Sequence, residues 1–201
     1  FDAYAPTFDA HLLEQLAYRT PEALAEAVGD AGLPRNGAAD VLDLGCGTGL
    51  SGLAIKPFAR SIVGIDLSPR MLERAAATGV YSRLLQAELP GCLDCEPAAS
   101  FDLALAADVM IYLGDVAPVL AALARVLRKG GLCALSFESL QPGEGGKDMA
   151  ISEKLRFAHD ADAVVAVMRV HDFHPVLRRE LGLRLERGRP VPGFIVVARR
   201  A

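Results

Sequence analysis

The chain has 201 residues, 52% of them hydrophobic, and a formal net charge of −4. A chain of this size can bury a substantial core, so we expect one domain over residues 1–201. The net negative charge argues against nucleic acid as a partner, since a phosphate-binding surface needs clustered basic residues. No apolar run approaches the roughly 18 to 20 residues of a spanning helix, and no secretory signal is recognisable, so we expect a cytoplasmic protein without a membrane anchor.

Two helices are predicted first, over Pro6–Leu16 and Pro21–Ala31, with Thr20 as the N-cap of the second. A regular alternation of strands and helices follows. Strands are predicted at Asp40–Leu44 and Ser61–Asp66, and helices at Thr48–Phe58 and Ser68–Thr78. This order is βαβα.

Tyr81–Gln86 and Phe101–Ala107 are predicted to be a third and a fourth strand, each covered on both faces in a parallel sheet. Apolar residues at helical spacing from Val116 to Leu127 predict a helix, and Leu132–Phe137 predicts a fifth strand. A loop rich in glycine, Gln141–Lys147, precedes a helical stretch that we expect to run to about Arg169.

The chain ends in a predicted hairpin of Leu183–Arg187 and Phe194–Arg199. Its connection, Gly188–Gly193, is too short for the crossover that parallel strands need. The fold class is therefore α/β, a doubly wound and mostly parallel sheet whose terminal hairpin strand is antiparallel. The arginines of this region alternate with apolar and acidic residues and are interpreted as a solvated face: Arg178, Arg179, Arg184, Arg187 and Arg189.

A glycine-rich turn, Val41-Leu-Asp-Leu-Gly-Cys-Gly-Thr-Gly-Leu50, joins the first predicted strand to a helix. Glycines let the backbone turn sharply and approach a ligand, and free N–H groups at the helix start favour negative or polar ligand atoms. Because Gly47–Gly52 also matches the dinucleotide pattern GxGxxG, a nicotinamide-dependent oxidoreductase is an alternative. Asp43 argues against it, since a carboxylate there repels a pyrophosphate but suits a cofactor with an ammonium and a sulfonium group, such as S-adenosyl-L-methionine.

A second carboxylate, Asp66, ends the second predicted strand 21 positions after Gly45. At this spacing a carboxylate can accept hydrogen bonds from both ribose hydroxyls. The structural alternative is an ordinary helix cap beside Ser68.

The Asp43–Gly49 string resembles motif I of class I S-adenosylmethionine-dependent methyltransferases, and the terminal hairpin resembles their seven-stranded Rossmann-like sheet. The resemblance implies a methyltransferase whose product is S-adenosyl-L-homocysteine. It implies cofactor contacts from Asp43, Gly45, Cys46, Gly47, Gly49, Asp66, Leu67, Glu88, Leu89 and Ala107. Glu88, with the N–H of Leu89, would serve the adenine, although it could be a plain surface acid.

The segment Ala106–Leu113, which contains Ala107 and Asp108, resembles motif IV of the same family, which borders the methyl group and the acceptor. Asp108 could orient an acceptor or cap the following helix. If the acceptor loses a proton, His11 and His159 are candidate bases, each with a structural role as the alternative. Cys92 and Cys95 form a lone CxxC without further ligands, so no metal site is expected.

Four segments resemble a narrower group, the bacterial methyltransferase domains that often follow tetratricopeptide repeats: Phe1–Leu12, Leu16–Pro21, Phe157–His159 and Gly188–Gly193. This implies a possible repeat region outside the chain and an acceptor that is a small molecule or is presented by a protein. We expect residues 1–36 to form a helical lid on a core of residues 37–201, with Tyr4, Tyr18 and Arg19 facing the cofactor. A packing helix is the alternative to the lid, and a cofactor-binding module without turnover is the alternative to the enzyme.

Overall fold

The computed structural model describes residues 18–141, 148–152, 155–186 and 188–201. The helix predicted at Pro6–Leu16 lies outside these residues, as do Tyr4 and His11. Within the described ranges, no helix combines the length and the apolar character needed to cross a membrane.

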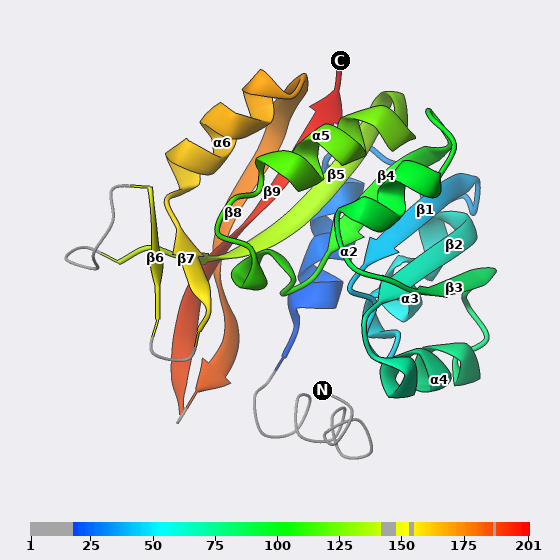
Figure 1. The fold of residues 1–201 in the computed structure, drawn as a ribbon, viewed down its shortest axis with the longest axis horizontal. Helices are drawn as coiled ribbons and strands as arrows, with labels where there is room; N and C mark the ends of the chain where they lie inside the picture. The colour runs from blue at the N-terminus through cyan, green and yellow to red at the C-terminus, as the bar shows by residue number, and fades with distance from the viewer. Residues whose placement is uncertain (1–17, 142–147, 153–154, 187) are drawn as a thin grey trace.

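The centre of the molecule is a twisted sheet in the order β3-β2-β1-β4-β5, all parallel (Figure 1). Its strands are β1 (Ala39–Leu44), β2 (Ala59–Asp66), β3 (Arg83–Gln86), β4 (Phe101–Ala106) and β5 (Leu127–Ser139). Beyond β5 lie β9 (Arg189–Arg200), antiparallel to β5, and then β8 (Phe173–Glu186), antiparallel to β9. This confirms the α/β class and the mostly parallel sheet that ends in an antiparallel hairpin.

The sheet has nine strands over the described residues, so the prediction of seven is wrong. The two additional strands, β6 (Met149–Ile151) and β7 (Phe157–His159), pair with each other, and β7 extends beside the end of β5. They occupy a segment predicted to be helical. The helix α6 (Ala161–Val170) starts only where the Asp160 carboxylate accepts from the N–H groups of Asp162 and Ala163.

The terminal hairpin is also longer than predicted, because most of the expected connection Gly188–Gly193 belongs to β9. In the first part of β8, exposed residues alternate with partly buried ones, so there is no apolar run to recognise. The strand β3 is less buried than predicted. It is an edge strand of partly buried and exposed residues, so the prediction that both of its faces are covered is wrong.

The helices begin and end at local sequence signals. They are α2 (Thr20–Asp30), α3 (Leu50–Ile55), the 3-10 turn η3 (Lys56–Phe58), α4 (Pro69–Ala77) and α5 (Ala117–Val126). Ser68 caps α4 as predicted, since its Oγ accepts from the N–H of Met71 at 3.2 Å. Thr20 does not cap α2. Arg19 is the N-cap residue, and the Thr20 hydroxyl donates instead to the carbonyl of Leu183 at 3.2 Å.

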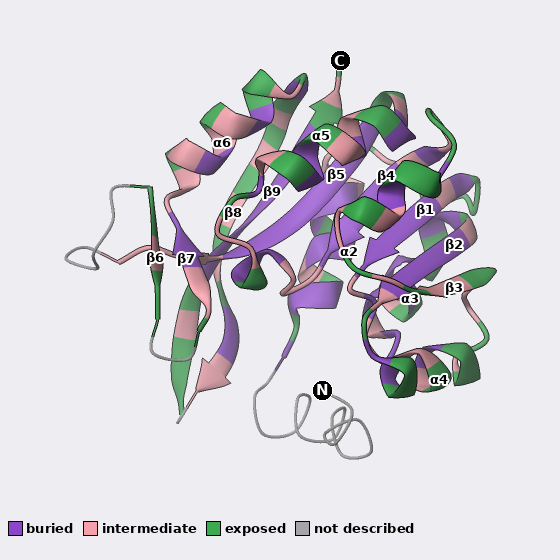
Figure 2. Cartoon of the chain, viewed as in Figure 1, coloured by how far each residue is buried: buried purple, intermediate pink, exposed green. Residues whose placement is uncertain are grey.

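Two hydrophobic cores lie on opposite faces of the sheet (Figure 2). α5 and α6 cover one face, and α2 with the end of α3 covers the other. Alternate residues of a strand enter opposite cores: Leu42 belongs to the first and Val41 to the second. By this alternation Asp43 lies on the face of Val41, beneath α2 and α3.

The candidate site residues gather because the parallel strands end at one edge of the sheet. Asp66 of β2 pairs with Gln86 of β3, and Asp43 of β1 pairs with Leu105 of β4. The turns after β1, β2, β3 and β4 therefore meet. The carboxyl end of an open parallel sheet is where α/β proteins place their ligands.

Candidate functional site

The turn after β1 has the left-handed backbone that its glycines predict. Gly45, Gly47 and Gly49 have φ of 62°, 53° and 99°. A Cβ on Gly45 would lie 2.4 Å from Cγ2 of Val109, so no larger residue fits without movement. At Gly47 a Cβ would meet nothing within 4 Å, which leaves the backbone approachable. Gly49 is the N-cap residue of α3, and it supplies no side-chain cap.

Asp66 fastens this turn to β2. Its Oδ2 accepts from the N–H of Gly47 at 2.8 Å, and its Oδ1 accepts from the N–H of Ser68 at 2.9 Å. The carboxylate thus links the glycine turn to the start of α4. Each carboxylate oxygen has a further lone pair and can accept a second donor.

Asp43 is completely buried, with an exposed fraction of 0%. Its Oδ2 accepts from the Tyr81 hydroxyl at 2.7 Å, while Oδ1 has no hydrogen-bond partner among the described residues. Burial raises the pKa of this carboxyl to about 7, with Tyr81 opposing the shift and Asp66 adding to it. A buried acceptor without a donor is costly and indicates a missing partner.

The other residues predicted to contact the cofactor lie along the same carboxyl edge of the sheet. Glu88 is exposed and Leu89 partly buried in the turn after β3, and Leu67 is 64% exposed beside Asp66. Ala107 is partly buried after β4. Cys46 is buried in the glycine turn, and its N–H donates to the carbonyl of Ile65 at 2.9 Å.

Asp108 does not cap a helix, because the N-cap residues of the two following helical segments are Val109 and Val116. It has a left-handed φ of 55°, and its N–H donates to Oγ of Ser136 at 2.8 Å. Its Oδ2 accepts from Nη1 of Arg184 at 3.1 Å. Burial raises the pKa of the Asp108 carboxyl, and Arg184 partly counters this shift.

Arg184 is the centre of a buried charge cluster, which corrects its assignment to a solvated face. Its side chain is 5% exposed. Besides Asp108, its guanidinium donates to Glu138 of β5 and, at 3.3 Å, to Glu186 of β8. No local pattern in the sequence marks this cluster, because its members come from three separate strands or strand ends.

Tyr18 is close enough to both Asp43 and Asp108 for their charges to affect its pKa. It is 7% exposed, and burial, followed by the charge of Asp108, raises its pKa well above the usual range. Asp43 adds to the same shift. Arg19 is exposed. The lid over residues 1–36 stays a prediction, because its first 17 residues lie outside the described ranges.

His159 is buried at the end of β7, with an exposed fraction of 3%. Its ring packs edge-on against Phe137 at 5.4 Å between centroids. Neither nitrogen has a partner of good hydrogen-bond geometry among the described residues, although the backbone of Leu113 and Gly114 is close enough to affect its pKa. Burial outweighs that contribution and lowers the pKa, so the imidazole is neutral at pH 7.

Cys92 and Cys95 lie in a 3-10 turn, and all four cysteines are free. The described residues contain no group of three or more His, Cys, Asp or Glu side chains placed to hold a metal ion.

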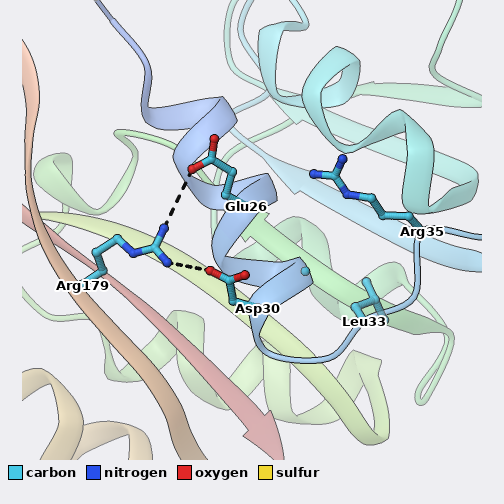
Figure 3. A pocket seen from close by; sticks show the side chains of 6 residues that line it. Glu26, Asp30, Leu33, Arg35 and Arg179 are labelled. Atoms are coloured by element: carbon cyan, nitrogen blue, oxygen red, sulfur yellow. Dashed lines mark hydrogen bonds and ion pairs between the residues drawn. The ribbon is translucent and has the colours of Figure 1, made fainter.

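A surface hollow of about 500 Å³ lies away from these residues, beside α2 (Figure 3). It is lined by Glu26, Gly29, Asp30, Leu33, Arg35 and Arg179. Arg179 pairs with Asp30 at 2.7 Å, so its guanidinium is already partnered. None of the residues predicted for the cofactor site lines this hollow.

Comparison with known proteins agrees with the geometry. Residues 42–135 match the family model described as a methyltransferase domain. The trans-aconitate 2-methyltransferase of Azoarcus sp. (strain BH72) is 42% identical over 108 residues, which are 52% of this chain and 41% of that protein. The 27-O-demethylrifamycin SV methyltransferase of Amycolatopsis mediterranei (strain S699) is 31% identical over 172 residues, 81% of this chain and 60% of that protein. The chain thus spans less than two thirds of these curated relatives.

Among solved structures, an S-adenosylmethionine-dependent methyltransferase from Mesorhizobium loti superimposes with a TM-score of 0.63 at 26% identity. The superposition covers 88% of this chain and 98% of that one. The chain therefore has the Rossmann-like fold of that S-adenosylmethionine-dependent methyltransferase, and its residues 42–135 are similar to the methyltransferase domain family.

Proposed function

We propose that this chain is an S-adenosyl-L-methionine-dependent methyltransferase that acts on a small-molecule acceptor. The observation that carries the proposal is Asp43 Oδ1, a buried oxygen without a donor among the described residues, beside an open glycine turn. A charged donor such as an ammonium group makes a stronger hydrogen bond to a carboxylate than a neutral donor does. Asp43 and the glycine turn therefore fit S-adenosyl-L-methionine.

The residues at the carboxyl edge of the parallel sheet each have a role in this proposal. Asp43 pairs with the cofactor's ammonium group, and the backbone at Gly47 lies against it. Asp66 keeps the turn in place and accepts from the ribose hydroxyls with its remaining lone pairs. Glu88 and Leu89 border the adenine.

The bound cofactor supplies an activated methyl group, and the protein positions the acceptor and excludes water. Asp108 follows β4, and Arg184 holds its carboxylate in one orientation. We assign the acceptor side to this pair. His159 is neutral and could accept a proton, as could His11, but the burial of His159 against Phe137 favours a structural role.

The names of the two curated relatives support a small-molecule acceptor, since each names one: trans-aconitate and 27-O-demethylrifamycin SV. An acceptor presented by a neighbouring tetratricopeptide-repeat region remains the narrower hypothesis from the sequence, as does a cytoplasmic location. Asp43 Oδ1 supports a binding module without turnover as well, so an assay of turnover must separate that module from the enzyme. The oxidoreductase has no comparable observation in its favour.

Binding of S-adenosylhomocysteine tests the proposal. We expect micromolar-range affinity by calorimetry and no binding of NAD. Replacement Asp66→Ala should weaken binding by about 1.5 to 3 kcal/mol, because a charged hydrogen-bond acceptor is lost. Release of S-adenosylhomocysteine with a panel of small acids and alcohols then separates turnover from binding alone.

The matched control is Asp162→Ala on α6, whose carboxylate is 88% exposed and pairs with exposed Arg178. It should bind S-adenosylhomocysteine as the parent does. Thermal unfolding checks that Asp66→Ala still folds, and Asp66→Asn, which keeps one acceptor oxygen, should be less affected. Tight NAD binding, or an Asp66→Ala variant with unchanged affinity, would contradict the proposal.

A further inference from the structure

Tyr81, between α4 and β3, fits against three glycines. A Cβ on Gly52 would lie 2.4 Å from its hydroxyl oxygen, and one on Gly64 would lie 2.8 Å from Cε1. A Cβ on Gly49 would also be close, at 3.2 Å from Cε2 of Tyr81. These glycines come from the helix α3, its N-cap and the strand β2. The ring is therefore held where only glycine leaves room for it.

The Tyr81 hydroxyl joins two parts of the site. It donates to Oδ2 of Asp43 at 2.7 Å and accepts from the N–H of Gly52 at 3.2 Å. A phenol has one proton to donate, and Asp43 receives it. The third glycine of the dinucleotide-like pattern, Gly52, thus makes space for this phenol.

We infer that Tyr81 is a positioning residue for the cofactor: its phenol fixes one oxygen of the Asp43 carboxylate and leaves the other for the ligand's ammonium group. The inference rests on the proposed function. Tyr81 acts through Asp43 and needs no contact with the ligand. Without the hydroxyl, the carboxylate can rotate and is less stable in its charged form.

The charge state of Asp43 gives this role a distinctive pH dependence. Among the residues that the structure describes, the titratable groups near its carboxylate are Tyr81, Asp66, Cys46 and Tyr18. Burial raises the pKa of Asp43 to about 7, and the Tyr81 hydrogen bond lowers it from a higher value. Removal of the hydroxyl moves this pKa upward, so more of the carboxyl is neutral at pH 7.

The experiment compares Tyr81→Phe with the parent by calorimetry with S-adenosylhomocysteine from pH 6 to 9. We expect affinity about tenfold lower or more at pH 7, as for loss of a hydrogen bond to a charged group, and a smaller difference at pH 9. Ser82→Ala is the control, because it removes a hydroxyl next to Tyr81 that donates to the carbonyl of Ile62 at 2.9 Å and not to Asp43. Its binding should match the parent's.

A double-variant cycle with Asp43→Asn separates positioning from mere packing. In the Asp43→Asn background, Tyr81→Phe should change affinity less than about twofold, measured by the ligand-induced shift in unfolding temperature at millimolar S-adenosylhomocysteine. An equal loss in both backgrounds, or a loss that does not vary with pH, would overturn the inference and leave the proposed function intact. A parent protein that binds no S-adenosylhomocysteine would overturn both.

Discussion

Replacement of Arg184 by alanine is expected to lower the free energy of unfolding by about 3 to 5 kcal/mol. Its guanidinium is 5% exposed and joins Asp108, Glu138 and Glu186. Without it, Asp108 loses its ion-pair partner, while Arg156 remains as a cation beside Glu138 and Glu186. The mutual repulsion and the desolvation of the three carboxylates are then only partly compensated. Urea denaturation monitored by circular dichroism measures the difference.

The same strand offers a matched control. Arg178 of β8 is 43% exposed and pairs with the 88% exposed Asp162, so solvent screens this interaction. Arg178→Ala should cost at most about 1 kcal/mol. If the two variants lost the same stability, the cluster around Arg184 would have to be as well solvated as the surface pair.

Asp43→Asn is expected to stabilise the ligand-free protein at pH 8 by up to about 4 kcal/mol while it weakens cofactor binding. The folded carboxyl has a pKa of about 7, against an ordinary value of 3.8. Between these values the folded state holds a proton that the unfolded chain has released, so the parent loses stability as pH rises from about 4 to about 7. The size follows from about three pKa units at about 1.4 kcal/mol each.

Unfolding by urea at pH 4.5 and pH 8 tests this expectation. The parent should be less stable at pH 8 relative to the variant, and the two should approach each other at pH 4.5. Asp162→Asn, an exposed replacement, serves to subtract the general effect of a lost charge. A parent and variant that differ equally at both pH values would show that Asp43 titrates normally. The predicted gain in stability of Asp43→Asn is the free energy of folding that the parent loses because it keeps a buried carboxylate for the ligand.

The local parts of the fold could be predicted because each has a signal within a few residues. Ser68, Pro69 and Gly79 mark the two ends of α4, and the apolar run before Gly45 marks β1. The additional strands β6 and β7 have no such signal. They are three residues long, and β7 is held by pairing with the end of β5, which is distant in the sequence.

The residues of the candidate site also divide into those with a local signal in the sequence and those without one. Asp43 and Asp66 stand at the ends of recognisable strands, so their position beside the glycine turn could be predicted, while their contacts with a cofactor stay predictions. Tyr81 and Arg184 could not be found, since a tyrosine just before a strand and an arginine among several arginines have no distinctive local pattern. Their roles arise from partners 38 and 76 positions away, Asp43 and Asp108 respectively. The glycines at 52 and 64 were a usable hint, because each leaves space for Tyr81.

Cys46 lies within the glycine turn, where burial raises the pKa of its thiol, and the nearby carboxylates of Asp43 and Asp66 raise it further. The nucleophilic and oxidisable form of cysteine is the thiolate, which this environment suppresses at neutral pH. Cys133 is buried in β5, and burial raises its pKa also, to about 12. The most accessible thiol is Cys95, in a turn on the outside of the sheet. Alkylating agents and peroxide are therefore expected to react with Cys95 first, and only slowly with Cys46 in the glycine turn.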